Sequence, residues 1–436
     1  VIVGNGIAGT TVARHVRKRS AMRIIMISAE SNYFYSRTAL MYIYMGHMRF
    51  DHTKPYEDWF WEKNKIELIH DYVEEIDLLQ KSVNLKGGQK IAYDHLVLAT
   101  GSKPNKFGWP GQDLPGVQGF YSLQDLELME ENTRNCKNAV IVGGGLIGIE
   151  VAEMLKSRQI HVTFLIRENE YWDNVLPANE AALISNHILS HDIDLRKQSQ
   201  LKEIIAGNDG RVCAVITDAG ERIDCQFVAL TAGVSPNIDL AKKSGILVQR
   251  GILVNEQLKT SIDTIYACGD CAEIVSDSDQ RIEQLWYTGK LQGESLAQTI
   301  LGNDKNYNRG IWFNSAKFFD IEYQTYGVVA NTVQADEESF YWQDSTRQRC
   351  LRIVFKLDNE VISGVNVFGI RMRQKVWEKW ISKQKTIDYV MTHLRDANFD
   401  PEFFRQYETE IIEEYNKQFS KTLKLKQKSW TFRRAL

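Results

Sequence analysis

One nine-letter pattern occurs twice in the chain, as "VIVGNGIAG" at Val1–Gly9 and as "VIVGGGLIG" at Val140–Gly148. Each copy joins a β-branched run to a G-x-G-x-x-G turn and then to a segment with helical apolar spacing. The first glycine permits the tight turn, the second lets the backbone approach a pyrophosphate, and the third lets helix and strand pack closely. The helix N-terminus then offers free N–H groups to phosphates. A single copy could be a plain glycine-rich turn, but two predict two Rossmann-like, dinucleotide-binding domains in an α/β chain.

The residues that follow each second strand bear on which dinucleotide binds. A Rossmann unit carries an acidic residue about 20 positions past its glycines, where it binds a ribose hydroxyl. Glu30 stands there after the first copy and predicts a cofactor without a 2′-phosphate, as FAD is. After the second copy comes Arg167, which could accept the 2′-phosphate of NADPH, but Glu168 and Glu170 beside it would repel that group. The preference between NADH and NADPH therefore stays open.

Length and composition restrict the remaining function classes. A chain of 436 residues predicts two or three domains, and a net charge of −3 gives no basic surplus for nucleic acid. We expect no transmembrane segment, because no run of about 18 apolar residues occurs. The six cysteines are scattered, which favours a reduced, cytoplasmic setting. The sequence starts inside a predicted strand without Met, so a short leader could precede it.

Two pairs of side chains could bind a metal. Cys268 and Cys271, in "IYACGDCAEI", have the spacing of a redox disulfide or half a zinc site, but zinc needs further ligands. His187 and His191 lie four residues apart on a predicted helix, with no third ligand evident in the sequence. We therefore expect no metal site, and we expect the two thiols to be packing residues. The other cysteines are solitary: Cys136, Cys213, Cys225 and Cys350.

Six segments carry a family resemblance that spans about residues 1–310. They are "VIVGNGIAG", "AESNYFYSR", "YDHLVLATGSKPN", "VIVGGGLIGIE", "LTAGVSPN" and "IYACGDCAE". In content and order the chain resembles the two-dinucleotide-binding-domain flavoproteins, the FAD-dependent pyridine nucleotide oxidoreductases. Among them it is most similar to the NAD(P)H-dependent rubredoxin, ferredoxin and nitrite reductase flavoprotein group.

The resemblance implies three domains. Residues 1–112 and 234–310 would form a discontinuous FAD-binding domain, and residues 113–233 an NAD(P)H-binding domain. Residues 311–436 would form a C-terminal α+β domain with a helical extension, a type of domain that often lies at a dimer or acceptor interface. A homodimer is therefore one expectation.

The resemblance also implies which residues bind FAD. They are Gly4, Gly6, Ala8 and Gly9 at the pyrophosphate, Glu30 at the ribose, Arg37 near the diphosphate or flavin, Val73 at the adenine, Thr100 and Gly101 beside the cofactor, and Asp270 at a ribityl hydroxyl. Asp270 thus becomes the functional residue between the two cysteines. Trp286, before a helix whose N-terminus would face the flavin, is either a flavin-side aromatic or a core tryptophan.

The implied nicotinamide site lies around the second motif. Gly143, Gly145 and Gly148 would cradle the dinucleotide, with Arg167 at the ribose end; Glu150 would lie near the nicotinamide–flavin contact, and Gly233 beside the nicotinamide. Disulfide reductases of the wider family carry cysteines in the helix after the ribose acid, but "SRTALMYIYMGHMRF" has none. Many relatives hold a lysine near flavin N5 there, and the aligned position is Tyr42. We take Glu150 and Tyr42 as the candidate catalytic residues.

The sequence thus predicts an FAD-dependent NAD(P)H oxidoreductase without a redox-active disulfide. Hydride would pass from NAD(P)H to flavin N5, and electrons then to a small iron–sulfur or rubredoxin-like protein. Two alternatives stay open: an NAD(P)H oxidase or quinone reductase, and an apoptosis-inducing-factor-like protein whose partner binding is redox-switched. A basic tail over residues 421–436 either packs on its own chain or a dimer partner, docks an acidic electron carrier, or attaches to a membrane surface. Its basic residues are Lys421, Lys424, Lys426, Lys428, Arg433 and Arg434.

Overall fold

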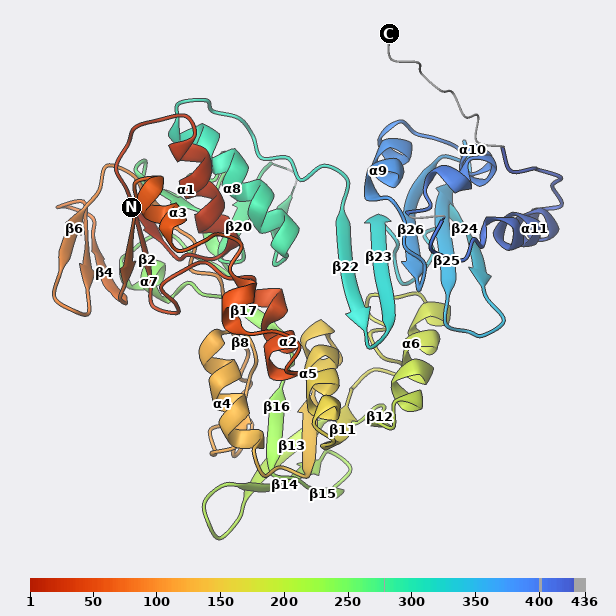
Figure 1. Ribbon diagram of the computed structural model, residues 1–436, viewed down its shortest axis with the longest axis horizontal. Helices are drawn as coiled ribbons and strands as arrows, with labels where there is room; N and C mark the ends of the chain where they lie inside the picture. The colour runs from red at the N-terminus through yellow and green to blue at the C-terminus, as the bar shows by residue number, and fades with distance from the viewer. Residues whose placement is uncertain (278, 400–401, 427–436) are drawn as a thin grey trace. The chain divides into compact units, whose positions relative to one another are not determined.

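The computed structural model describes residues 1–277, 279–399 and 402–426, and the chain divides into two compact units (Figure 1). Unit 1 comprises Val1–Arg167 and Gln198–Arg309, and unit 2 comprises Glu168–Lys197 and the chain from Gly310 onward. The mixture of parallel sheets flanked by helices with a separate antiparallel sheet confirms the predicted fold class. The three-domain boundaries stay a prediction.

The first glycine motif lies in a five-stranded parallel sheet of unit 1, in the order β19-β7-β1-β2-β3. Its strands are apolar almost throughout, as in "IIMIS", because both faces are covered. Helices α1 and α8 lie side by side on it (Figure 1). The bounds are β1 (Ile2–Val3), α1 (Ile7–Arg17), β2 (Ile24–Ser28), β3 (Ile66–His70), β7 (Leu96–Leu98), β19 (Ile265–Ala267) and α8 (Trp286–Ile300).

The second motif repeats this arrangement in another parallel sheet of unit 1, which contains, in order, β11, β10, β16 and β9. Strand β10 leads through the glycine turn into α5, as β1 leads into α1. This sheet completes the predicted pair of Rossmann-like folds. The bounds are β9 (Val117–Gln118), α4 (Leu123–Thr133), β10 (Asn138–Val142), α5 (Leu146–Ser157), β11 (His161–Leu165) and β16 (Phe227–Leu230).

Smaller elements complete unit 1. Strands β8 (Ser102–Pro104) and β17 (Val234–Pro236) pair antiparallel where the chain passes from one Rossmann-like fold to the other and back. Three small sheets are β4-β5-β6, β13-β14-β15 and β18-β20-β21. The bounds are α2 (Leu40–Tyr44), α3 (Trp59–Lys63), β4 (Val73–Asp77), β5 (Ser82–Leu85), β6 (Lys90–Ala92), β13 (Leu201–Ala206), β14 (Val212–Thr217), β15 (Arg222–Asp224), α7 (Asp239–Lys243), β18 (Ile252–Val254), β20 (Ala272–Val275) and β21 (Gln280–Ile282).

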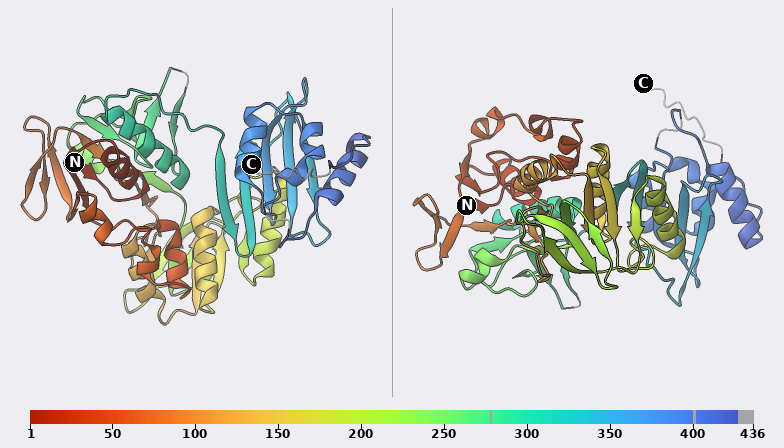
Figure 2. Two further views of the ribbon diagram at one scale, coloured as in Figure 1. Left: turned by 45° about the horizontal axis from the view of Figure 1, so that its top comes forward. Right: turned by 90° about the horizontal axis from the view of Figure 1, so that it is seen from below.

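Unit 2 is built on a five-stranded antiparallel sheet, in the order β22-β23-β26-β25-β24 (Figure 2). The β25–β26 hairpin turns at Asp358–Asn359. Buried aromatic side chains such as Trp377, Phe340 and Tyr415 fill the space between this sheet and its helices. The bounds are β22 (Phe313–Phe318), β23 (Ile321–Gly327), β24 (Glu337–Gln343), β25 (Cys350–Lys356), β26 (Ile362–Phe368), α9 (Gln374–Ser382), α10 (Ile387–Thr392) and α11 (Glu408–Phe419).

Unit 2 also contains a segment from the middle of the chain, with α6 (Ala178–Ser190) and β12 (Asp194–Arg196). Helix α6 is joined to the sheet by a buried ion pair, in which Arg352 Nε donates to Glu180 Oε1 at 2.6 Å. The sequence places this helix within residues 113–233, whereas its compact unit is that of residues beyond 310. Apolar spacing shows that a helix has a buried face, but not which sheet covers it.

The first part of the basic tail packs on unit 2. Lys421 Nζ lies 2.7 Å from Asp388 Oδ1, and Leu423 and Leu425 contact the unit 2 core. This arrangement supports self-packing for the described part of the tail. Lys428, Arg433 and Arg434 lie outside the described residues. Among the residues the structure describes, no helix has the length and apolarity needed to cross a membrane.

Candidate functional site

A cavity of ≈ 440 Å³ lies in unit 1 at the carboxyl ends of β1, β2, β7 and β19. This edge is where open α/β sheets bind their ligands. Ten residues predicted to bind FAD line it: Gly4, Gly6, Ala8, Glu30, Arg37, Val73, Thr100, Gly101, Asp270 and Trp286. Segments that are distant in sequence thus converge on one space, and Trp286 faces the cavity rather than the core.

The three glycines of the turn that lines the cavity have different structural roles. Gly4 has φ +108°, and a Cβ there would lie 2.1 Å from the Ala99 carbonyl oxygen. A Cβ on Gly9 would lie 2.1 Å from the Gly4 carbonyl oxygen, so this glycine permits helix and strand to touch. By contrast, a Cβ on Gly6 would meet nothing within 4 Å, and no side chain caps α1. The open space above Gly6 and the uncapped helix end fit a pyrophosphate.

Glu30 is held as a fixed negative charge at the cavity wall. Its carboxylate accepts hydrogen bonds from Arg37 Nη2 at 2.6 Å, from the Tyr35 hydroxyl and from the Leu123 backbone N–H at 3.0 Å. Burial opposes ionisation, but the Arg37 guanidinium outweighs it and holds the pKa of Glu30 below its usual range. Arg37 also donates to the Tyr121 carbonyl oxygen at 2.6 Å, which fixes the guanidinium in place. A carboxylate held in this way can accept bonds from ribose hydroxyls.

Asp270 follows β19 and is half-buried in the cavity wall. Its Oδ2 accepts hydrogen bonds from the Ser102 and Tyr121 hydroxyls, each at 3.2 Å. Burial raises the pKa of Asp270, although both hydroxyl bonds oppose that shift. The preceding Gly269 has φ +79°, and its Cβ would lie 2.9 Å from Ala8 Cβ. The loop therefore brings Asp270 close to the first turn of α1.

The cysteines that flank this loop are packed in the interior of unit 1, and Cys268 also borders the cavity. Cys268 and Cys271 are both fully buried and both are free thiols. Burial raises the pKa of each, that of Cys268 well above its ordinary value. Cys271 Sγ donates to the Leu98 carbonyl oxygen at 3.4 Å. Neutral, buried thiols are poor nucleophiles and poor metal ligands, so this geometry favours the packing interpretation.

The three glycines of the second turn have the same structural roles as those of the first. Gly143 has φ +114°, and its Cβ would lie 2.7 Å from Ala232 Cα. A Cβ on Gly148 would lie 2.6 Å from the Gly143 carbonyl oxygen, whereas Gly145 faces open space. Gly233 follows with φ +87°. A second backbone cradle thus exists at the N-terminus of α5, and Arg167 is exposed after β11.

The two candidate catalytic residues lie elsewhere in unit 1. Glu150 is on α5 and Tyr42 is on α2, and both are half-buried. Among the described residues that line the ≈ 440 Å³ cavity, neither occurs. Burial, with the negative charge of Glu153 acting in the same direction, raises the pKa of Glu150 to about 7. This carboxyl can gain or lose a proton near neutral pH.

Sequence reasoning missed Ser102 and Tyr121, the two hydroxyl donors to Asp270. Ser102 lies in the segment "YDHLVLATGSKPN" but was given no role, whereas Tyr121 belongs to none of the six segments, and each reaches Asp270 only through the fold. One signal was available: Ser122 and Asp125 form a capping box that starts α4 and fixes the residue before it.

Comparison with known proteins places these features in a family. Residues 1–293 match the family model described as pyridine nucleotide-disulphide oxidoreductase. The chain is 31% identical over 405 residues to an NADH oxidase of Methanocaldococcus jannaschii, covering 86% of this chain and 89% of that one. It is 26% identical to an NADH-rubredoxin oxidoreductase of Clostridium acetobutylicum, covering 89% of this chain and 96% of that one. The crystal structure of NADH:rubredoxin oxidoreductase from that organism matches with a TM-score of 0.70 and 27% identity, covering 89% of this chain and 95% of that one.

Proposed function

Because the chain belongs to the pyridine nucleotide-disulphide oxidoreductase family and is an FAD-dependent NAD(P)H oxidoreductase, we propose that it delivers electrons to a small rubredoxin-like or iron–sulfur protein. The observation that carries this proposal is the cysteine-free segment 36–50, whose Arg37 and Thr38 line the cavity. Without thiols there, a dithiol relay is unavailable at this wall. The similarity to NADH-rubredoxin oxidoreductase supports a protein acceptor instead.

The chain's own residues supply the binding of FAD. Gly6 and the first turn of α1 would hold the pyrophosphate, Glu30 the ribose hydroxyls, and Asp270 a ribityl hydroxyl. Val73, Thr100 and the remaining lining residues would enclose the rest of the cofactor. When bound, the flavin supplies hydride acceptance from NAD(P)H and onward transfer of the electrons.

NAD(P)H would bind at the second glycine cradle, with its pyrophosphate at Gly145 and the N-terminus of α5. Glu150 lies a little more than one turn further along the same helix, and its pKa of about 7 suits it to hold a proton near the nicotinamide. Tyr42, on α2, would take the place of the lysine that many relatives hold near the flavin. Gly233 would keep the segment beside the nicotinamide free of a side chain.

Two broader proposals accompany this function. All six cysteines are free thiols, and because thiols stay reduced in a reducing compartment they support a cytoplasmic location. A homodimer, with the C-terminal α+β domain at its interface, is the oligomeric state we propose on the family resemblance alone.

The test is anaerobic reduction followed by reoxidation. The FAD-loaded protein is mixed with NADH or NADPH, and the reduced protein is then mixed with rubredoxin, a [2Fe–2S] ferredoxin, oxygen or a quinone. We expect reduction by at least one nucleotide and faster reoxidation by a redox protein than by oxygen or quinone. Reoxidation by oxygen or quinone alone would refute the proposed acceptor.

One observation favours a second candidate function. The relative with 31% identity is an NADH oxidase, so oxygen is the alternative acceptor to measure first. A reduced protein that persists with every acceptor would instead favour a redox-switched binding protein.

A further inference from the structure

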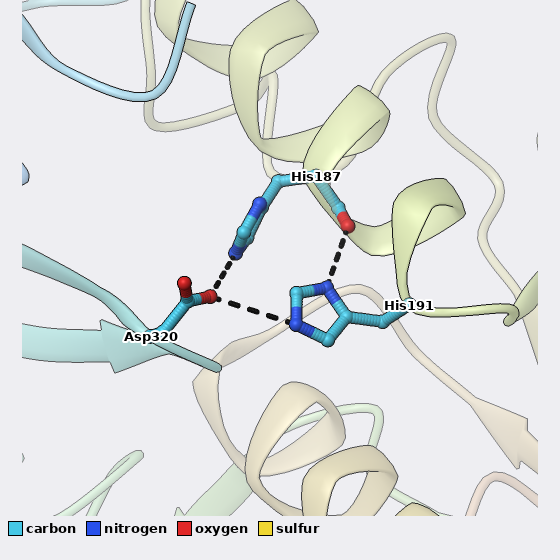
Figure 3. Close-up of side chains that lie close together, drawn as sticks. All are labelled: His187, His191 and Asp320. Atoms are coloured by element: carbon cyan, nitrogen blue, oxygen red, sulfur yellow. Dashed lines mark hydrogen bonds and ion pairs between the residues drawn. The ribbon is translucent and has the colours of Figure 1, made fainter. Parts of the chain in front are cut away.

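Three metal-ligating side chains converge within unit 2 (Figure 3). His187 lies in the last turn of α6, His191 is the residue that directly follows this helix, and Asp320 lies in the turn between β22 and β23. His187 Nε2 lies 2.7 Å from Asp320 Oδ1, and His191 Nε2 lies 3.5 Å from the same oxygen. The sequence shows the histidine pair but no third ligand, because Asp320 is more than a hundred residues away. The fold supplies it.

The hydrogen bond on the other side of His191 fixes the state of its ring. His191 Nδ1 lies 2.9 Å from the His187 carbonyl oxygen. A carbonyl oxygen only accepts, so Nδ1 must carry the hydrogen, and Nε2 of the neutral ring then holds a lone pair. This lone pair faces a carboxylate oxygen, which is also an acceptor (Figure 3). Two facing acceptors call for a positive charge between them, either a second proton or a metal ion.

The surroundings hold the three groups ready for a metal. The His187 side chain is only 6% exposed, which holds its ring in place beside Asp320. The Phe319 ring stacks on His191 at 4.1 Å between centroids with an interplanar angle of 15°, which fixes the imidazole plane. The Asp320 side chain is 70% exposed, so an ion can enter from solvent. A hydrogen bond from Nδ1 to a backbone carbonyl is also the usual second-shell partner of a metal-bound histidine.

We propose that His187, His191 and Asp320 form a binding site for a divalent transition-metal ion, with Zn²⁺ as the best fit. Imidazole and carboxylate ligands select such ions over Mg²⁺ and Ca²⁺. Ligand atoms of one tetrahedral zinc ion lie about 3.3 Å apart, given zinc–ligand bonds of about 2.0–2.1 Å. His191 and Asp320 are already near that separation, whereas His187 and Asp320 must move apart as the ion displaces the proton they share.

Three protein ligands would bind the ion, and water would fill its fourth coordination position. It would join α6, which comes from the middle of the chain, to the β22–β23 turn of the sheet. All three ligands therefore belong to unit 2, whereas the residues that line the cavity for FAD belong to unit 1.

Zinc titration of the FAD-loaded, chelator-treated full chain tests the proposal. Calorimetry with ZnCl₂ should show one site that MgCl₂ does not fill, and zinc should raise the thermal midpoint. Asp320→Asn and His191→Ala should each weaken that site about 100-fold or more, beyond the 10–100-fold typical of second-shell changes. His161→Ala, which removes an exposed histidine of β11, is the matched control and should bind zinc as the wild type does.

The outcomes separate this proposal from the flavin chemistry. X-ray absorption of the zinc-loaded protein should show nitrogen and oxygen neighbours without sulfur, and all variants should still be reduced by NAD(P)H. Absence of zinc binding, unchanged affinity in Asp320→Asn and His191→Ala, or sulfur coordination would each overturn the proposal. Loss of flavin reduction in the wild type would instead refute the proposed function and leave the zinc result intact.

Discussion

Replacing Glu150, on α5, by glutamine would raise the free energy of unfolding of the protein at alkaline pH. The pKa of the half-buried carboxyl is about 7 instead of 4.5, first because of burial and second because of the charge on Glu153. Between those two values the folded chain binds more protons than the unfolded chain, so the free energy of unfolding falls as the pH rises. The destabilisation is absent below pH 4.5 and complete above pH 7.

The size of this effect follows from the two pKa values. A rise from 4.5 to about 7 corresponds to about 3–4 kcal/mol at most, at 1.36 kcal/mol for each pH unit. Glutamine has a similar shape and no charge to bury, so Glu150→Gln should recover most of that free energy at pH 8. At pH 5 the difference should fall below about 1 kcal/mol. With roughly 2 °C per kcal/mol for a large unit, the midpoint at pH 8 should rise by about 6 °C.

The assay is thermal unfolding of the wild type and variants with saturating FAD at pH 5 and pH 8, followed by tryptophan fluorescence. Glu153→Gln, on the same helix, is the matched control; it removes the smaller, coulombic cause of the raised pKa and should give a smaller rise. An equal shift at both pH values, or a less stable Glu150→Gln protein at pH 8, would refute the assignment of a raised pKa to Glu150.

Three further changes test other parts of unit 1. Gly9→Ala should destabilise the protein by about 1–3 kcal/mol and lower the bound flavin per chain, because its Cβ overlaps a backbone oxygen; retention of both stability and flavin would contradict that contact. Glu30→Gln should lower the free energy of unfolding by about 1–3 kcal/mol at pH 7, because it leaves Arg37 without its charged partner. Since the pKa of Glu30 is lowered, the wild type should lose this advantage as the pH falls below 4.5. Denaturation at pH 7 and at a pH below 4.5 measures the difference. In a thiol titration, folded wild type and a Cys268→Ala, Cys271→Ala double variant should give equal counts, and two extra rapidly reacting thiols in the wild type would contradict the burial of the pair.

The parts of this molecule that the sequence could predict are those set by local backbone geometry. One strand-to-helix turn requires glycine at Gly4, Gly6 and Gly9, each for a different reason. The three residues lie within six positions of one another, so the sequence shows the requirement directly. The hydroxyl of Tyr121 at Asp270 depends instead on how two distant loops meet. The spacing of residues in the sequence does not predict such long-range contacts, because they depend on which sheet edge each loop reaches.

The same limit explains the third ligand of the proposed zinc site. Two histidines four residues apart on a helix can be recognised within the helix itself. Asp320 joins them only because α6 packs in unit 2, against a sheet whose strands are encoded more than a hundred residues later. Helical periodicity identified α6 but gave no partner for its buried face.

The membership of α6 in unit 2 also sets the order in which the newly made chain can fold. The segment Glu168–Lys197 leaves the ribosome before Gln198–Arg309, and its partner strands follow only after that stretch. At 5–20 residues per second, this is a delay of roughly 5–20 s for a stretch of about a hundred residues. During that time the apolar face of the helix and the carboxylate of Glu180 have no sheet and no Arg352 to receive them. Truncation after Arg309 would make this temporary exposure permanent, so the two units cannot be separated by a single cut.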